Sequence, residues 1–129
     1  MKSKIIMMII SIMLLTSCSQ PASKLPDKMS SIEAFTTVSS DASIVVMDVR
    51  TIAEYNEGHI KGSILVPLDR IQRSIEGILS DKNTTIFVVC RSGNRSAQAK
   101  SMLQKMGYAN VTDIGSVFTW PEPLVVPTQ

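Results

Sequence analysis

Residues 86–96 read IFVVCRSGNRS, and the rest of the architecture can be worked out from them. The first four residues are apolar and mostly β-branched, which predicts a buried strand. This strand leads to Cys90 and then to a loop that contains Gly93 and two arginines. A helix is predicted to start directly after the loop, at Asn94. We therefore expect a strand, a short loop and a helix in succession, with a thiol where the strand ends.

The loop after Cys90 has the composition of an anion-binding site. Gly93 permits the positive φ that lets a tight loop curl around the sulfur. Successive backbone N–H groups in such a curl, and the positive end of the following helix, attract negative charge. A thiolate held there has a pKa below its free value of about 8.5. Cys90 is therefore the candidate catalytic residue. The candidate substrate-binding residues are Arg91, Ser92, Gly93, Asn94, Arg95 and Ser96.

Short strands and helices alternate on both sides of this junction. Buried apolar strands that alternate with helices form a mostly parallel sheet covered on both faces. We therefore predict an α/β fold, a three-layer α/β/α domain with a central sheet of four to five strands. Ligands bind beyond the carboxyl ends of the strands in such sheets, where Cys90 lies. Strands are predicted at 44–49, 63–66, 86–89 and 111–114, and helices at 32–38, 51–57, 68–79 (interrupted at Gly77) and 94–106.

The first residues of the chain have the pattern of an export signal. Lys2 and Lys4 precede residues 5–15, in which only Ser11 is polar. This run is too short to cross a bilayer, which takes about 20 apolar residues. Leu-Thr-Ser-Cys then resembles the lipobox of bacterial lipoproteins. We expect residues 1–17 to be a lipoprotein-type signal peptide, with Cys18 as the lipidated residue, and an ordinary cleaved signal is the alternative.

The expected anchor places the protein at the cell envelope, on the periplasmic side if the organism has an outer membrane. Residues 18–29 are polar, contain two prolines and are expected to form a tether. Residues 30–120 are long enough for one domain with a single core. Prolines predict an irregular tail over residues 121–129.

Charge and cysteine count limit the possible functions. Without Lys2 and Lys4 the chain has 11 Lys and Arg against 11 Asp and Glu, so no basic face is expected to bind nucleic acid. The chain has two cysteines, and a lipid on Cys18 would leave Cys90 unpaired. An inert buried cysteine is the alternative for a thiol at a strand end, but the composition of its loop favours a reactive one.

Three motifs together resemble the rhodanese domain. The first is Asp-Val-Arg at 48–50, followed by Glu-Tyr at 54–55. The second is Gly-His-Ile-Lys-Gly-Ser at 58–63, and the third is the cysteine loop itself. The resemblance continues through Met-Gly-Tyr at 106–108 to Trp120. The chain has Ser63 where the family usually has Ala, and Gly115-Ser116 where it has Gly-Gly. Neither departure is expected to touch the cysteine loop.

The resemblance implies a sulfurtransferase that works by a ping-pong reaction. Cys90 would take a sulfane sulfur from a small anionic donor, thiosulfate or a persulfide, and pass it to a thiol or to cyanide. The resemblance implies no metal and no organic cofactor, and we expect a monomer. A low-turnover sulfur carrier or redox sensor at the cell envelope would use the same cysteine and is the alternative.

Two other kinds of cysteine enzyme fit less well. Tyrosine phosphatases have five residues between their cysteine and arginine, whereas four lie between Cys90 and Arg95. A thioredoxin-like oxidoreductase needs a Cys-x-x-Cys pair, which the sequence lacks.

Other polar residues near the motifs are expected to support the site. His59 is the only histidine, and we expect it to fix its own turn by bonding backbone rather than to act as a base for Cys90. Asp48 and Arg50 follow a buried strand and are expected to form a positioning pair. Trp120 is expected to anchor the end of the domain by packing.

Overall fold

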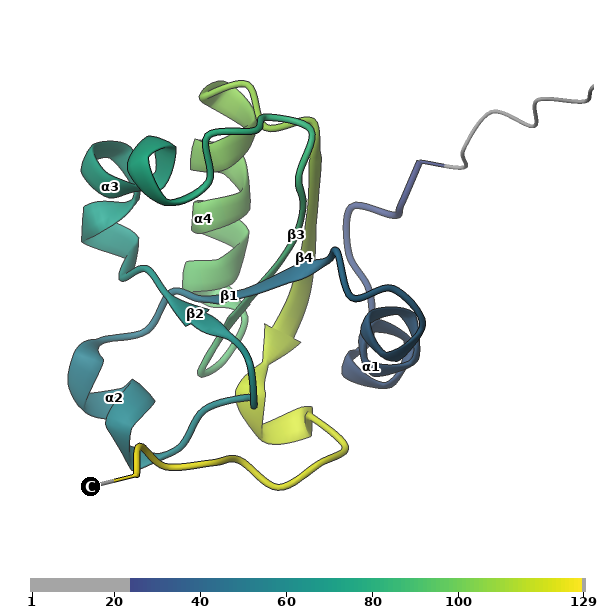
Figure 1. Cartoon of the computed structure of the whole chain (residues 1–129), viewed down its shortest axis with the longest axis vertical. Coiled ribbons are helices and arrows are strands. Elements are labelled where there is room, and N and C mark those ends of the chain that lie inside the picture. Colours follow the sequence, from purple (N-terminus) through teal and green to yellow (C-terminus); the bar gives the residue numbers. More distant parts are fainter. Residues whose placement is uncertain (1–23, 129) are drawn as a thin grey trace, which may run out of the picture.

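The computed structural model describes residues 24–128 (Figure 1). The expected signal peptide, Cys18 and the first part of the tether lie outside the described residues.

Four parallel strands form the central sheet in the order β2-β1-β3-β4. They are β1 (Val45–Asp48), β2 (Ile64–Leu65), β3 (Thr85–Cys90) and β4 (Asn110–Ser116). The predicted parallel sheet is confirmed. β2 is shorter than the predicted strand, because the N–H of Ser63 bonds the carbonyl of Ile60 in a turn.

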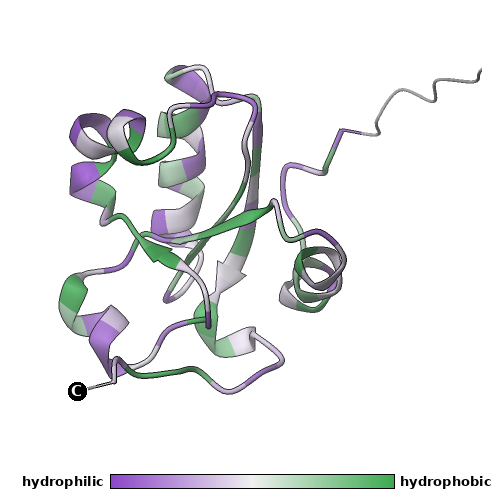
Figure 2. Cartoon of the chain, in the orientation of Figure 1, coloured by the Kyte–Doolittle hydropathy of each residue, from purple (hydrophilic) through white to green (hydrophobic). Residues whose placement is uncertain are grey.

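Helices cover both faces of this sheet, which confirms the three-layer prediction (Figure 1). α1 (Ser31–Ser40) packs on one face, and α3 (Ile71–Ile78) and α4 (Asn94–Lys105) pack on the other. Figure 2 shows β1 and β2 as mostly apolar, and β3 has an apolar run from Ile86 to Val89. Side chains alternate between the faces: Met47 and Val88 pack toward α3 and α4, and Val46 and Phe87 toward α1.

Two helices begin at capping boxes. Ser30 and Glu33 exchange hydrogen bonds at the start of α1, and Thr51 and Glu54 do the same at the start of α2 (Ile52–Glu57). The second box fixes the position of Glu54 near the end of the sheet where Cys90 lies.

The predicted helix over residues 68–79 is divided, but not at Gly77. A 3₁₀ turn, η1 (Leu68–Arg70), precedes α3, and Arg70 joins them with φ −102° and ψ −14°. Gly77 stays inside α3, where an added Cβ would meet nothing within 4 Å. The division therefore follows the turn after Pro67 rather than the glycine.

Both ends of the described chain pack against the domain. The tether is expected to run to residue 29, yet the N–H of Met29 bonds the carbonyl of Asp113, and the N–H of Asp113 bonds the carbonyl of Asp27. These bonds cover the outer edge of β4, and apolar Leu25 and Met29 pack on the core. Residues 121–128 contain no helix or named strand, but Val125 pairs with His59 through two backbone hydrogen bonds.

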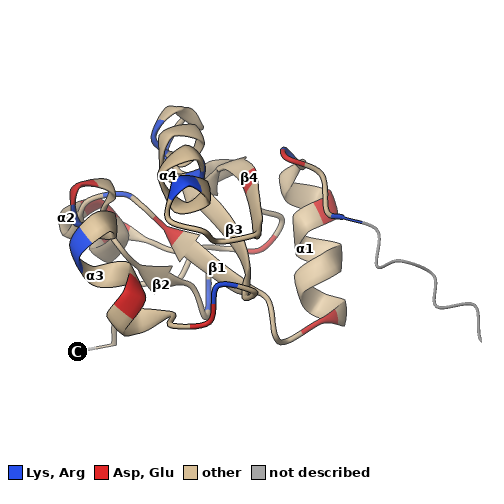
Figure 3. Cartoon of the chain, turned by 90° about the horizontal axis from the view of Figure 1, so that it is seen from above, with Lys and Arg blue, Asp and Glu red and all other residues tan. Residues whose placement is uncertain are grey.

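Acidic and basic positions are spread over several elements of the described chain (Figure 3). No helix in residues 24–128 combines the length and the apolar character that crossing a membrane requires.

Candidate active site

The carboxyl ends of neighbouring strands bring the predicted site residues together. Asp48 ends β1 and pairs in register with Val89, the residue before Cys90 at the end of β3. On the other side of β3, Val88 pairs with Asp113 and Cys90 pairs with Ser116. β4 therefore has one more residue than β3 over this interval, which is a bulge.

The loop after Cys90 curls back over the sulfur as predicted. Gly93 has φ +91° and ψ −9°, a left-handed conformation that favours glycine, and α4 starts at the next residue. The N–H of Gly93 donates to Cys90 Sγ at 3.0 Å. Cys90 is 0% exposed, whereas Arg91, Ser92 and Asn94 at the tip of the loop are exposed. The sulfur thus lies beneath its own loop.

The surroundings of Cys90 favour its thiolate. Burial raises the pKa of the thiol, but hydrogen bonds, among them those from the N–H groups of Ser96, Gly93 and Ser92, outweigh it. The net result is a pKa below the ordinary value of a cysteine. Backbone donors at the start of α4 therefore supply the stabilisation that the sequence predicted for this loop.

Ser96 links the sulfur to a buried carboxylate. Its Oγ lies 3.6 Å from Cys90 Sγ and donates to Asp113 Oδ1 at 2.6 Å. The N–H of Gly115 also donates to Asp113 Oδ1, at 2.9 Å. Ser96 is 0% exposed and Asp113 5% exposed, so water is largely excluded from this chain of groups.

The two loop arginines have different environments. Arg95 forms a bidentate ion pair with Glu54, at 2.7 and 2.8 Å, from the first turn of α2. Arg91 is exposed, and its guanidinium lies 5.4 Å from the centre of the Phe118 ring. Glu54 therefore neutralises much of the charge of Arg95, while Arg91 has no ion pair within the described residues.

Asp48 and Arg50 form the expected pair. Arg50 Nη2 lies 2.7 Å from Asp48 Oδ2, both side chains are buried, and the same nitrogen donates to the carbonyl of Gly58 at 2.7 Å. The pair ties the end of β1 to the Gly58 turn.

His59 lies in the turn that Arg50 holds. Its Nδ1 is 2.9 Å from the carbonyl oxygen of Tyr55, and its ring stacks on the Tyr55 ring at 3.8 Å between centroids. These contacts favour the structural role that we expect for His59.

The sequence model of the family described as "Rhodanese-like domain" matches residues 31–120. The chain belongs to the rhodanese family. The match spans every strand of the sheet and the whole cysteine loop.

Relatives of this rhodanese domain include named sulfurtransferases. The Escherichia coli thiosulfate sulfurtransferase PspE is 38% identical over 71 residues, which are 55% of this chain and 68% of PspE. A sulfurtransferase of Allochromatium vinosum is 33% identical over 88 residues, 65% of this chain and 80% of its own. A solved structure of an E. coli rhodanese with anions is 34% identical and superposes with a TM-score of 0.62, covering 65% of this chain and 99% of that one.

One expectation about the departures from the rhodanese pattern is wrong. Ser116 does touch the cysteine loop, because its hydroxyl donates to the carbonyl of Arg91. The bulge in β4 causes this contact by placing Ser116 opposite Cys90. Ser63 does not contact the loop: its hydroxyl donates to the carbonyl of Ile60 at 2.6 Å.

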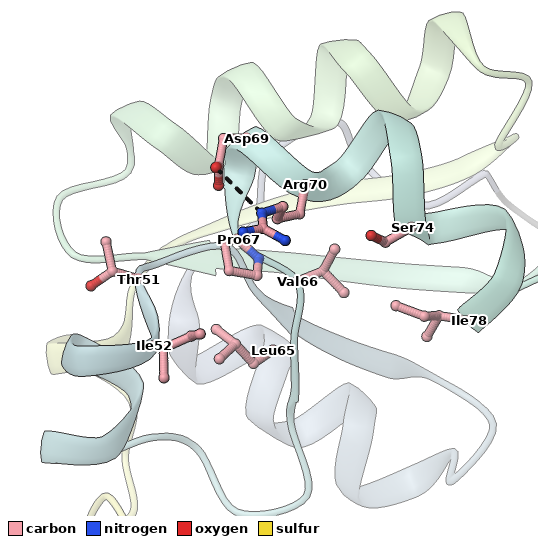
Figure 4. A pocket seen from close by; sticks show the side chains of 9 residues that line it. All are labelled: Thr51, Ile52, Leu65, Val66, Pro67, Asp69, Arg70, Ser74 and Ile78. Atoms are coloured by element: carbon pink, nitrogen blue, oxygen red, sulfur yellow. Dashed lines mark ion pairs between the residues drawn. The ribbon is translucent and has the colours of Figure 1, made fainter.

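Two adjoining clefts lie beside the Arg95 side of the rhodanese site. One, of about 400 Å³, has apolar walls that include Ile52, Leu65 and Ile78 (Figure 4). The other, of about 420 Å³, shares Thr51, Pro67 and Asp69 with the first and reaches Arg50 and Arg95. The structure therefore offers room for a molecule next to Arg95.

Sequence reasoning did not assign three polar residues that the fold brings to the rhodanese site. Glu54 is part of the Glu-Tyr motif at 54–55, but the sequence did not identify it as the partner of Arg95. Asp113 is an acidic residue within a predicted buried strand, and that position alone could have identified it as a candidate site residue. Ser116 gave no signal beyond its departure from glycine.

The Glu54–Arg95 pair predicts a pH-dependent contribution to stability. The hydrogen bond from Arg95 is the main reason that the pKa of Glu54 falls from 4.5 to about 2. The stabilisation is complete above about pH 4.5 and is lost as the pH falls through about 2. Glu54→Gln is therefore expected to lower the free energy of unfolding by about 1–2 kcal/mol at pH 7, since both groups are partly exposed. Urea denaturation at several pH values measures this, and a difference that persists undiminished below pH 2 would contradict it.

Proposed function

We propose that this chain is an extracytoplasmic sulfurtransferase that moves a sulfane sulfur from thiosulfate or a persulfide to a thiol or cyanide through a Cys90 persulfide. The observation that carries the proposal is the position of Cys90 Sγ, which accepts the N–H of Gly93 at 3.0 Å where α4 begins. Relatives named as sulfurtransferases support it.

The first half-reaction loads the cysteine. The Cys90 thiolate attacks the outer sulfur of thiosulfate, and a new S–S bond forms as the S–S bond of thiosulfate breaks. Sulfite leaves with the electron pair of the broken bond. Arg91 and Arg95 would orient the anionic donor at the mouth of the loop.

The second half-reaction unloads it. An acceptor thiolate, or cyanide in the assay, attacks the outer sulfur of the persulfide, and the Cys90 thiolate leaves. Backbone N–H groups of the loop stabilise the negative charge on sulfur in both states, because they are already oriented before the reaction starts.

Mass spectrometry of the full chain tests this proposal. Incubation with thiosulfate is expected to add one sulfur atom, located by peptide mapping at Cys90, and cyanide is expected to remove it as thiocyanate in repeated turnovers. If neither the added sulfur nor thiocyanate is found, the proposal and its alternative are both wrong.

The alternative is a low-turnover sulfur carrier or redox sensor at the cell envelope. It predicts a persulfide at Cys90 that persists in the presence of cyanide or small thiols. The buried sulfur is the observation that favours it, because the exposed tip of the loop must shift before an acceptor can reach Cys90.

Location at the envelope rests on the Leu-Thr-Ser-Cys motif. In bacterial cells the full chain is expected to incorporate labelled palmitate, and Cys18→Ser is expected to abolish the label and release the protein from the membrane fraction. Cys90→Ser is the matched control, because it removes the other cysteine and should leave labelling unchanged. Equal labelling of the Cys18→Ser variant would contradict the anchor.

A further inference from the structure

Asp113 is a buried carboxylate with an unusual set of partners. Its side chain is held inside β4 by two neutral donors, the hydroxyl of Ser96 and the N–H of Gly115. Within residues 24–128 no Lys, Arg or His nitrogen lies within 4.0 Å of its carboxylate oxygens. A buried charge without a cationic partner is costly to keep. Only the Ser96 hydroxyl separates this carboxylate from Cys90, so Asp113 is placed to influence the ionisation of the thiol.

The Ser96 hydroxyl has one proton and three possible acceptors for it. Asp113 Oδ1 lies at 2.6 Å, the carbonyl oxygen of Gly93 at 3.0 Å and Cys90 Sγ at 3.6 Å. Asp113 Oδ1 is the charged acceptor and lies nearest, so the Ser96 hydroxyl donates its proton to it. Ser96 Oγ then presents its lone pairs to the sulfur, where they accept the S–H of a neutral Cys90 thiol.

Ionisation of Cys90 disturbs this arrangement. A thiolate cannot donate to Ser96 Oγ, so either the oxygen lone pairs face the charged sulfur or the hydroxyl turns away from Asp113 to donate to it. In the second case the carboxylate keeps only the N–H of Gly115, and in both cases two negative charges face each other across one hydroxyl. The loss of the donor and the repulsion both disfavour the thiolate.

Lys28 and Lys100 line one cleft with Asp113, but neither forms an ion pair with its carboxylate. Lys100 of α4 donates to the carbonyl of Asp27 at 2.8 Å and pairs with the Asp27 carboxylate at 3.2 Å. Lys28 pairs with Asp113 through the backbone, and Glu33 of α1 bonds its own helix cap.

On the side of Cys90, most of the charged groups are paired with one another. Arg95 is bound by Glu54 and Asp48 by Arg50, while the exposed Arg91 lies over Phe118. None of these residues hydrogen-bonds to Ser96 or to the Asp113 carboxylate.

We propose that Asp113 is a positioning residue for Cys90: by holding the Ser96 proton, its carboxylate favours the thiol form of the unloaded cysteine. The inference rests on the proposed function, in which Cys90 is the nucleophile. Asp113 then sets what fraction of the unloaded Cys90 is present as thiolate. Thiols are oxidised through their thiolates, so the arrangement also protects an idle Cys90. The backbone N–H groups still act on the sulfur, and Asp113 limits how far they lower its pKa.

The acidity of Cys90 in Asp113→Asn tests the proposal. Alkylation by iodoacetamide at a series of pH values, followed on the Cys90 peptide by mass spectrometry, reports the fraction of thiolate. The midpoint is expected to fall by about one pH unit, because an amide carries no charge and can donate to Ser96 Oγ. Asp27→Asn is the matched control: it removes the same charge from a largely exposed carboxylate and should leave the midpoint in place. An unchanged or higher midpoint in Asp113→Asn would overturn the proposal.

A second variant keeps the test open if Asp113→Asn fails to fold. In Ser96→Ala the alkylation midpoint of Cys90 is expected to stay the same or fall, since the Ser96 hydroxyl does not donate to the sulfur in the native protein. A rise of about one unit would show that Ser96 donates to the thiolate, and the proposal would be wrong. The alkylation assay needs no sulfur donor, so its result is independent of whether the protein forms a persulfide.

Discussion

Replacing Cys90 by serine is expected to slow sulfur transfer from thiosulfate to cyanide by more than about 10³-fold while the fold stays intact. Serine has nearly the same volume, and its oxygen can still accept the N–H of Gly93 beneath the loop. An alkoxide is not available near neutral pH, because a hydroxyl is far less acidic than a thiol, and oxygen cannot form a persulfide. Thiocyanate formation measures the rate, and circular dichroism checks the fold.

Ser101→Ala is a suitable control for this loss of activity. Ser101 is exposed on α4, and none of the hydrogen bonds described for the site joins its side chain to the cysteine loop. Its replacement by alanine should leave the rate of thiocyanate formation unchanged. A Cys90→Ser variant that kept a tenth of the native rate would mean that sulfur transfer does not pass through Cys90.

Asp48→Ala is expected to lower the free energy of unfolding by about 3–5 kcal/mol, which is a large part of the stability of a domain of this size. Asp48 is 0% exposed and Arg50 2% exposed. The substitution removes the carboxylate that accepts the Nε and Nη2 hydrogens of Arg50, and leaves a buried guanidinium bonded to the carbonyl of Gly58. Urea denaturation at pH 7 measures the change.

An exposed ion pair provides the comparison for this prediction. Asp69 and Arg70 lie 3.6 Å apart, and their side chains are 76% and 63% exposed. Asp69→Ala should therefore leave the stability almost unchanged. The double variant Asp48→Leu, Arg50→Met should be more stable than Asp48→Ala, because it leaves no unpaired charge inside the protein. A loss of less than about 1 kcal/mol in Asp48→Ala would show that water reaches Arg50.

The parts of the site that follow from local physics could be predicted from the sequence. An apolar run ending in Cys90, a glycine that allows the curl and a helix directly behind it are all contained in eleven consecutive residues. The parallel sheet follows from apolar strands that alternate with helices. Thr51 and Glu54 are only three residues apart, so their capping box is also a local feature.

The contacts that could not be predicted join residues far apart in the sequence. Glu54 and Arg95 are separated by 41 positions, and they meet because α2 and α4 both begin at the same end of the sheet. Residues 27–29 look like a tether by composition, but β4 is an edge strand whose unpaired backbone groups bind them. Asp113 reaches the sulfur only through the tertiary position of Ser96.

The bulge in β4 makes the length of this strand matter more than its composition. Three residues of β3 (88–90) lie opposite four of β4 (113–116), so Asp113 can bind Ser96 while Ser116 lies opposite Cys90 and bonds the carbonyl of Arg91. Removing one residue between Asp113 and Ser116 would restore a regular ladder, but a shift of one position turns every later side chain to the opposite face of the sheet. In homologous proteins that keep this site, insertions and deletions should therefore be confined to the turns on either side of β4.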